Sequence, residues 1–167
     1  ILELGGRPAL EVLKGVYADL PTHEQASMQH GFHIGRVVSE YQDEYEMGDF
    51  LIRNVLGVDS DQEAVVVADY LNVGQTVQFH LRDDESADHE LRQLLTQYDS
   101  SATQGALLFT CNGRGKRMFA EPDHDTGVIK ECLGELPLAG FFAQGEIGPV
   151  SGKNFVHGLT ASLLIFD

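Results

Sequence analysis

The sequence has no tryptophan and only two cysteines, Cys111 and Cys132. Two cysteines cannot build the disulfide framework of a small secreted domain, so we expect reduced thiols and a cytoplasmic location. No apolar run approaches the roughly 18 residues that a membrane span needs, and no secretory signal peptide opens the chain. The chain begins with Ile1 rather than Met, and we therefore expect a fragment of a longer polypeptide.

Positive charge is also scarce, because 11 Lys and Arg stand against 26 Asp and Glu, for a formal net charge of −15. Nucleic acid is excluded as a partner, since binding a phosphate backbone needs a cationic surface that releases counterions. Docking on an anionic membrane surface is disfavoured for the same reason. A length of 167 residues with 43% hydrophobic residues is enough for a folded core, and we expect one domain over residues 1–167.

The negative charge is concentrated in the middle of the sequence. Residues 40–99 hold fifteen acids and three cations, which gives −12 of the total charge. Residues 100–167 are close to neutral, with seven acids and five cations, and they contain ten of the 18 glycines. Glycine-rich segments often form binding loops, although turns in a compact fold explain the same excess.

Hydrophobic periodicity predicts an α+β fold, with a mixed, largely antiparallel sheet of about seven strands and about three helices. The first helix begins at Arg7-Pro8 and stops at Pro21, and the second follows the acids at 83–88. A third begins at Asp123 or Asp125, either of which can cap it, and ends at Gly134. Apolar segments that fit strands are 1–4, 32–38, 50–55, 65–68, 75–81, 106–109, 138–143 and 159–166.

Three further expectations concern the arrangement of these elements. The polar stretch 22–30 should be irregular. Val73-Gly74 predicts a hairpin turn within an antiparallel meander. The continuous apolar segments 106–109 and 138–143 are typical of strands that are buried on both faces.

The first candidate site is the loop 111–117, CNGRGKR, which follows a predicted buried strand. Open sheets place their binding crevices at such strand ends. Gly113 and Gly115 would let backbone N–H groups converge on an anion, and Arg114 can bind a carboxylate or phosphate through two hydrogen bonds. A solvated Gly-Arg turn explains the pattern equally well. The loop lacks the Gly-Lys-Ser/Thr ending of a nucleotide-binding P-loop.

The second candidate site is the segment 140–149, GFFAQGEIGP, in which two phenylalanines lead into a glycine-rich bend. Glu146 stands among apolar neighbours, where a carboxylate needs a partner such as a ligand amine or Arg114. A solvent-facing turn acid is the alternative. The third candidate is His157, at the mouth of the last strand, which could bind a ligand or satisfy backbone groups, and we favour the backbone role.

Catalysis and metal binding are not expected. Cys111 has an arginine and backbone donors nearby, but a cysteine nucleophile also needs a base, and none stands at a diagnostic spacing. Asp123, His124 and Asp125 are adjacent in sequence, and adjacent residues rarely converge on one ion, whereas helix capping explains both aspartates. We therefore expect no cofactor, no metal and no enzymatic activity.

The chain resembles the C-terminal part of the FIST family, the sensory domain named for F-box and intracellular signal transduction proteins. Four segments carry the resemblance in order: LLFTCNGRG, EPDHD, PLAGFFAQGEIGPV and NFVHGLTASLLIF. The earlier segments GGRPALEV, GDFLIRNVLGVD and GQTVQFHLRD also resemble this family, so the likeness covers nearly the whole chain. It implies that an N-terminal FIST half precedes Ile1.

The resemblance implies a noncatalytic domain that senses small ligands, with amino acids proposed, in a bacterial signal-transduction protein. Implied partners are the N-terminal half or linked modules such as chemoreceptors, histidine kinases and cyclic-dinucleotide enzymes, and an F-box in eukaryotes. The residues themselves suit a zwitterion: Arg114 and the backbone at 112–115 for its carboxylate, Glu146 for its amine, and Phe141 or Phe142 for its side chain. The full expected ligand site is Cys111, Asn112, Gly113, Arg114, Gly115, Phe141, Phe142, Gly145, Glu146 and His157.

Two other functions are compatible with the sequence. One is a protein-interaction module that docks a partner through the acidic stretch 40–99. The other is a cysteine-dependent enzyme, which would need a reactive thiol at Cys111.

Overall fold

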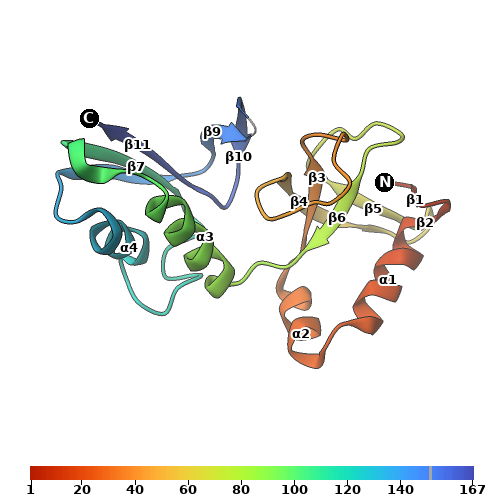
Figure 1. Cartoon of the computed structure of the whole chain (residues 1–167). Coiled ribbons are helices and arrows are strands. Elements are labelled where there is room, and N and C mark those ends of the chain that lie inside the picture. Colours follow the sequence, from red (N-terminus) through yellow and green to blue (C-terminus); the bar gives the residue numbers. More distant parts are fainter. Residues whose placement is uncertain (151) are drawn as a thin grey trace. The chain divides into compact units, whose positions relative to one another are not determined.

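The computed structural model describes residues 1–150 and 152–167, apart from the side chain of His30. The chain divides into two compact units, residues 1–82 and residues 83–167, which are drawn in Figure 1. The predicted α+β class is confirmed. The single sheet of about seven strands and the three helices are wrong, because the described residues form four α-helices and eleven strands in four sheets. The expectation of one domain stays a prediction.

The first unit is built on a four-stranded antiparallel sheet with the strand order β5-β4-β3-β6. Its strands are β3 (His33–Val37), β4 (Phe50–Asp59), β5 (Ala64–Val67) and β6 (Val77–His80). The predicted hairpin at Val73-Gly74 is wrong, because β6 pairs with β3 and not with β5. Asp69, just after β5, accepts hydrogen bonds from Arg53 at 3.1 Å and Arg36 at 3.2 Å, and so ties this segment to both middle strands.

Two helices and a short ribbon complete the first unit. The ribbon pairs β1 (Glu3–Leu4) with β2 (Arg7–Pro8), and the helices are α1 (Ala9–Asp19) and α2 (Thr22–His30). The stretch 22–30 is therefore helical and not irregular. Among the side chains of this helix that the structure describes, only Met28 is buried, so the helix has no apolar periodicity for a sequence pattern to detect. One buried cluster of this unit consists of Ala9, Leu10, Leu13, Met28 and Val65.

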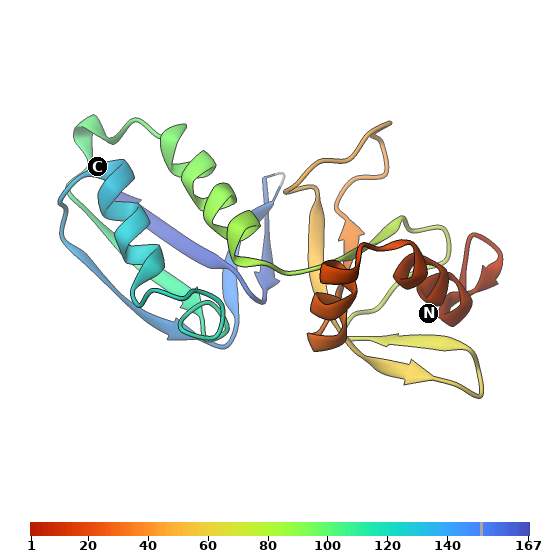
Figure 2. The ribbon, with the colours of Figure 1, turned by 90° about the horizontal axis from the view of Figure 1, so that it is seen from below.

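The second unit contains a three-stranded sheet with the order β11-β7-β8. Strands β7 (Gly105–Cys111) and β8 (Leu138–Ala143) are parallel, and β11 (Ala161–Phe166) is antiparallel to β7. Helix α4 (His124–Leu133) connects β7 to β8, and α3 (Asp84–Thr96) opens the unit; a short 3-10 helix, η1 (Ser100–Ala102), lies between α3 and β7. Both α-helices cover the same face of the sheet, as Figure 2 shows. The core between them is Leu91, Leu95, Leu108, Val128 and Ile129.

Of the predicted ends of α3 and α4, two are confirmed and one is wrong. The side chain of Asp83 accepts a hydrogen bond from Ser86 N at 2.6 Å and caps α3. Gly134 ends α4 with a φ of 82°, a left-handed backbone that suits glycine. Asp123 precedes α4 but makes no capping hydrogen bond, and the carboxylate of Asp125 is bound elsewhere, as described below. Capping therefore does not explain these two aspartates.

Strand β8 is less buried than its apolar sequence suggests. Phe141 is 64% exposed and Phe142 is 55% exposed, because β8 lies at the edge of the sheet and the helices cover one face only.

A hairpin of β9 (Glu146–Val150) and β10 (Lys153–His157) follows. The sequence patterns missed this hairpin, since Gly145, Gly148 and Pro149 interrupt the alternation. Among the described residues, no helix is long and apolar enough to cross a membrane.

Candidate functional site

A cavity of about 220 Å³ lies in the second unit. It is bounded by strand β8, the last residues of β7 and the beginning of helix α4. The cavity therefore lies at the end of a strand, a position that suits a binding crevice. Its lining residues are Leu108, Thr110, Arg114, Gly115, Asp123, His124, Asp125, Thr126, Leu138, Ala139, Gly140, Phe141 and Phe142. The apolar members come from the strands, and the charged members come from the loop 112–123 and α4.

Arg114 and Asp125 form a buried ion pair in the wall of this cavity. Arg114 donates from Nη2 to Asp125 Oδ1 at 2.8 Å and from Nε to Oδ2 at 2.9 Å, while Thr110 Oγ1 donates to Oδ2 at 2.7 Å. Burial alone would raise the pKa of Asp125, but the hydrogen bonds and charge of Arg114 outweigh it and lower the pKa. The pair uses two of the five N–H donors of Arg114, so a ligand would meet an ion pair and not an isolated cation.

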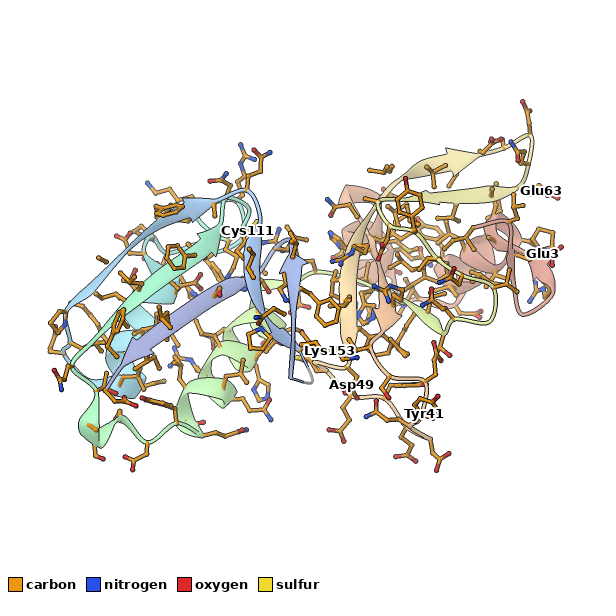
Figure 3. The ribbon with its side chains drawn as sticks, turned by 90° about the horizontal axis from the view of Figure 1, so that it is seen from above. Glu3, Tyr41, Asp49, Glu63, Cys111 and Lys153 are labelled. Atoms are coloured by element: carbon orange, nitrogen blue, oxygen red, sulfur yellow. The ribbon has the colours of Figure 1, made fainter. Side chains whose placement is uncertain are left out.

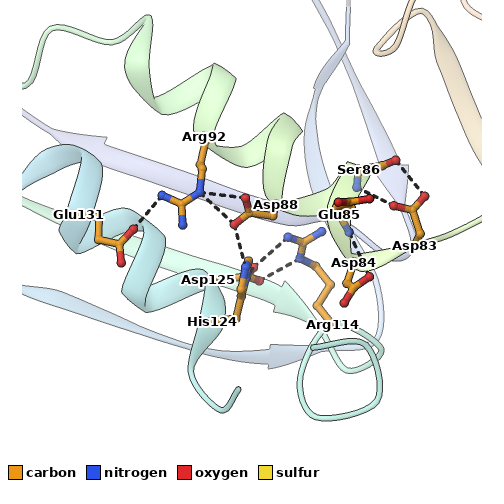
Figure 4. Close-up of polar contacts among 10 residues, drawn as sticks. All are labelled: Asp83, Asp84, Glu85, Ser86, Asp88, Arg92, Arg114, His124, Asp125 and Glu131. Atoms are coloured by element: carbon orange, nitrogen blue, oxygen red, sulfur yellow. Dashed lines mark hydrogen bonds and ion pairs between the residues drawn. The ribbon is translucent and has the colours of Figure 1, made fainter. Parts of the chain in front are cut away.

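His124 joins this pair to helix α3, as Figure 4 shows. Its Nδ1 lies 3.2 Å from Asp125 Oδ1, and its Nε2 lies 2.9 Å from Asp88 Oδ1 on α3. The ring of Phe119 stacks on the imidazole, with centroids 3.6 Å apart and planes 5° apart. Sequence reasoning missed the functional placement of Thr110, His124 and Asp125. The one available signal was the motif EPDHD, which we interpreted as a helix cap.

The predicted anion cradle does not form in the loop after β7. Asn112 N donates to Ala143 O at 2.8 Å, Arg114 N donates to Cys111 O at 2.8 Å, and Gly113 N donates to Cys111 Sγ at 3.4 Å. These backbone N–H groups are therefore engaged within the protein. Gly115 has a packing role instead, because a Cβ on it would lie only 3.3 Å from the ring of Phe142.

Glu146 lies apart from the cavity lining, at the beginning of the β9–β10 hairpin. Its side chain is 1% exposed; Oε2 accepts a hydrogen bond from Thr160 N at 3.4 Å, and Oε1 is buried without a partner among the described residues. Burial raises the pKa of Glu146, although the backbone of Thr160 and Gly145 and the charges of His157 and Arg114 partly oppose the shift. The alternative of a solvent-facing turn acid is wrong, because Glu146 is buried. The pairing of Glu146 with a ligand amine or with Arg114 stays a prediction.

His157 lies opposite Glu146 in the hairpin register, and its Nε2 bonds to Gly148 O at 2.9 Å. The backbone role that we favoured for this histidine is therefore confirmed.

Cys111 ends strand β7, where Figure 3 labels it, and it is 8% exposed.

The structure divides the predicted site residues into two groups. Arg114, Gly115, Phe141 and Phe142 line the cavity, which lies on the helix-covered side of β7. Side chains alternate along a strand, so Cys111 points away from the side to which Thr110 points. The hairpin carrying Glu146 lies on that other side, where Ser162 Oγ donates to Ile147 O at 2.8 Å. The members that do not line the cavity are Cys111, Asn112, Gly113, Gly145, Glu146 and His157.

No group of three or more His, Cys, Asp or Glu side chains within residues 1–150 and 152–167 is arranged to hold a metal ion. Asp125 and His124 bond to each other and to their own neighbours. The polar groups of the cavity therefore offer hydrogen bonds and charge to a ligand.

The chain is similar to proteins of known sequence along nearly its whole length. An uncharacterised protein of Mycobacterium bovis is 48% identical over 171 residues, which cover 99% of this chain and 44% of that protein. An uncharacterised protein of Mycobacterium tuberculosis is 47% identical over 169 residues, with the same two coverages. An F-box/LRR-repeat protein of Arabidopsis thaliana is 29% identical over 138 residues, which cover 71% of this chain and 26% of that protein.

The chain thus spans less than half the length of the mycobacterial relatives that it matches. No solved structure gives a significant match. The FIST C domain matches residues 9–149, which include both helix α1 and the whole cavity lining. The chain therefore belongs to the FIST C domain family.

Proposed function

We propose that this chain is a noncatalytic ligand-sensing domain of a bacterial, cytoplasmic signal-transduction protein, and that an amino acid binds in the cavity of the second unit. One observation supports the proposal above all: the cavity combines a buried Arg114–Asp125 pair with the exposed aromatic ring of Phe142. A few convergent polar groups within an apolar lining are typical of small-molecule sites.

The size of the cavity favours a small ligand. Its volume is about 220 Å³, which is below the roughly 300–1,000 Å³ of pockets for drug-sized molecules. It equals the liquid volume of about seven waters, at roughly 30 Å³ each. A single amino acid fits this range better than a nucleotide or a larger cofactor.

The charges of the lining suit a zwitterion. The positive charge of Arg114 and the remaining N–H donors of its guanidinium can attract a carboxylate. Asp123, which is exposed at the beginning of α4 and makes no capping bond, can accept an ammonium group. This assignment replaces Glu146 as the acceptor of the amine, because Glu146 is not among the lining residues.

A thermal-shift screen of the common amino acids, one at a time, tests the proposal. A ligand at 100 times its Kd stabilises the folded chain by about 2.7 kcal/mol, and we expect a rise of several degrees in Tm. Phe142→Ala removes a lining ring that is already half exposed, and it should abolish the shift. Phe166→Ala is the matched control, since Phe166 is 47% exposed and does not line the cavity. No shift with any amino acid, or equal loss in both variants, would contradict the proposal.

The noncatalytic part of the proposal has its own test. Cys111 is buried and its Sγ accepts a hydrogen bond from Gly113 N, so we expect slow labelling by a thiol reagent at neutral pH in comparison with the unfolded chain. Fast and selective labelling of Cys111 would favour a cysteine-dependent enzyme instead.

A second candidate function is a protein-interaction module. Asp83, Asp84 and Glu85 are exposed at the beginning of α3 (Figure 4), within the most acidic part of the sequence. Reversing the charge of Asp84 and Glu85 leaves the Asp83 cap in place. If that variant lost a partner that the wild type binds, while Phe142→Ala kept it, docking through this acidic face would be favoured over ligand sensing.

A further inference from the structure

His124 stands at the centre of a continuous polar network that runs from the surface to the cavity. On α3, Arg92 donates to Asp88 at 2.9 Å and to Glu131 of α4 at 2.7 Å. Asp88 faces His124 Nε2, and His124 Nδ1 faces Asp125 in the cavity wall. Figure 4 shows that no other side chain in this group bridges α3 and the buried pair. The imidazole is therefore the link between the two ends.

The donor count favours a doubly protonated ring. Both ring nitrogens of His124 face carboxylate oxygens, which only accept hydrogen bonds when ionised. A neutral imidazole carries one N–H, so one of its nitrogens would present a lone pair to a carboxylate. Both contacts are hydrogen bonds only when the ring is an imidazolium.

The charge count leads to the same conclusion. The network around His124 contains the cations Arg92 and Arg114 and the anions Asp88, Asp125 and Glu131, so it carries one net negative charge while the imidazole is neutral. Protonation of His124 makes it neutral overall. The pKa of Asp88 is lowered, because the hydrogen bonds and charges of Arg92 and His124 outweigh its burial; Asp88 therefore stays ionised near neutral pH.

His124 is the first residue of α4, and its side chain is 17% exposed. The stack on Phe119, which also lies 5.3 Å from the Arg114 guanidinium, fixes the plane of the ring. The ring therefore stays in place whether it is charged or neutral.

We infer that His124 is a proton-controlled clamp: as an imidazolium it ties helix α3 to the wall of the cavity, and loss of its proton releases that tie. The cavity should therefore be most rigid, and should bind its ligand most tightly, at mildly acidic pH. This last step rests on the proposed function, whereas the clamp itself does not. Histidine is the side chain whose charge ordinarily changes between about pH 5 and 8, so a clamp of this kind would respond to pH in that range.

NMR on the whole 167-residue chain between pH 5 and pH 8.5 tests the clamp. The ring ¹⁵N shifts of His124 report its protonation, and hydrogen exchange reports how firmly α3 is held. After correction for the intrinsic pH dependence of exchange, we expect α3 amides to exchange about tenfold faster once the ring is neutral, the factor for losing one charge-assisted hydrogen bond. His124→Gln should remove this step, and His89→Gln should keep it, because His89 is exposed on the same helix.

Two outcomes overturn the clamp: exchange in α3 that ignores the ring shift of His124, or a step that persists in His124→Gln. If His124→Gln fails to fold, Asp88→Asn serves instead, since it removes the charge on the α3 side and should also remove the step. The amino-acid screen at pH 5.5 and pH 8 separates the two proposals. If α3 shows the exchange step but no amino acid binds, the proposed function is contradicted and the clamp is not. If an amino acid binds with equal affinity at both pH values, the proposed function stands and the control of the cavity by the clamp is contradicted.

Discussion

Replacing one member of the Arg114–Asp125 pair should destabilise the chain far more than replacing a member of an exposed pair. The two side chains are 6% and 7% exposed, and two N–H···O bonds of 2.8 and 2.9 Å join them. Removing one partner leaves a buried charge without compensation, which costs about 3–5 kcal/mol. We expect Arg114→Met to lower the free energy of unfolding by this amount in urea denaturation followed by circular dichroism.

A double variant and a surface control complete the experiment. Arg114→Met with Asp125→Leu removes both charges, so it should recover most of the loss, apart from about 1 kcal/mol for the hydrogen bond from Thr110. Arg7 and Glu11 are also joined, at 2.6 Å, but are 59% and 55% exposed. Arg7→Met should therefore cost less than about 1 kcal/mol. The reasoning is refuted if Arg114→Met costs no more than Arg7→Met, or if the double variant costs the sum of the two single changes.

Three further predictions concern other parts of the chain. Gly140→Ala should unfold the second unit, because its Cβ would lie 1.8 Å from Leu108 O of the neighbouring strand; a native circular dichroism spectrum would contradict this. Burial raises the pKa of Glu146, so its contribution to stability is present below the unfolded value of about 4.5 and is lost as pH rises through the folded value. Glu146→Gln should flatten that dependence in urea denaturation across the acidic range, and an unchanged slope would count against it. Burial lowers the pKa of His33 and of His80, so stability should be full above about 6.5 and fall as pH drops below it; replacing both with Gln should remove the fall, which thermal melts can measure.

Much of the second unit could be predicted from the sequence. Segments 106–109 and 138–143 form strands, and residues between them form a helix that ends at Gly134. These elements carry strong local signals, namely continuous apolar runs and a C-terminal glycine. The prediction that Phe141 and Phe142 are buried was wrong, because apolar runs do not reveal whether both faces of a sheet are covered.

The first unit was predicted less well, since its organisation depends on contacts between distant residues. Helix α2 buries one apolar side chain, so its sequence shows no helical repeat of apolar residues. Strand β6 pairs with β3, which lies about forty residues earlier in the chain, and local turn signals at Val73-Gly74 suggested the wrong partner. Asp69, bound by Arg36 and Arg53, ties the intervening segment to the sheet.

The candidate site was also predicted only in part. Sequence reasoning identified Arg114 and the two phenylalanines, which do meet at one cavity. It could not show that Arg114 is already paired with Asp125, because that pairing depends on how α4 packs on the sheet. It also could not show that Glu146 does not line this cavity, since alternation along β7 separates the two sides of the sheet only once the register is known.

The central claim is that an amino acid occupies the cavity bounded by β7, β8 and α4. The most direct measurement is a titration followed by amide chemical shifts, with the amino acid that gives the largest thermal shift. The account predicts saturable shifts confined to residues 110–115, 123–126 and 138–142, lost in Phe142→Ala and kept in Phe166→Ala. Shifts centred on the β9–β10 hairpin, or no saturable shift with any amino acid, would contradict it.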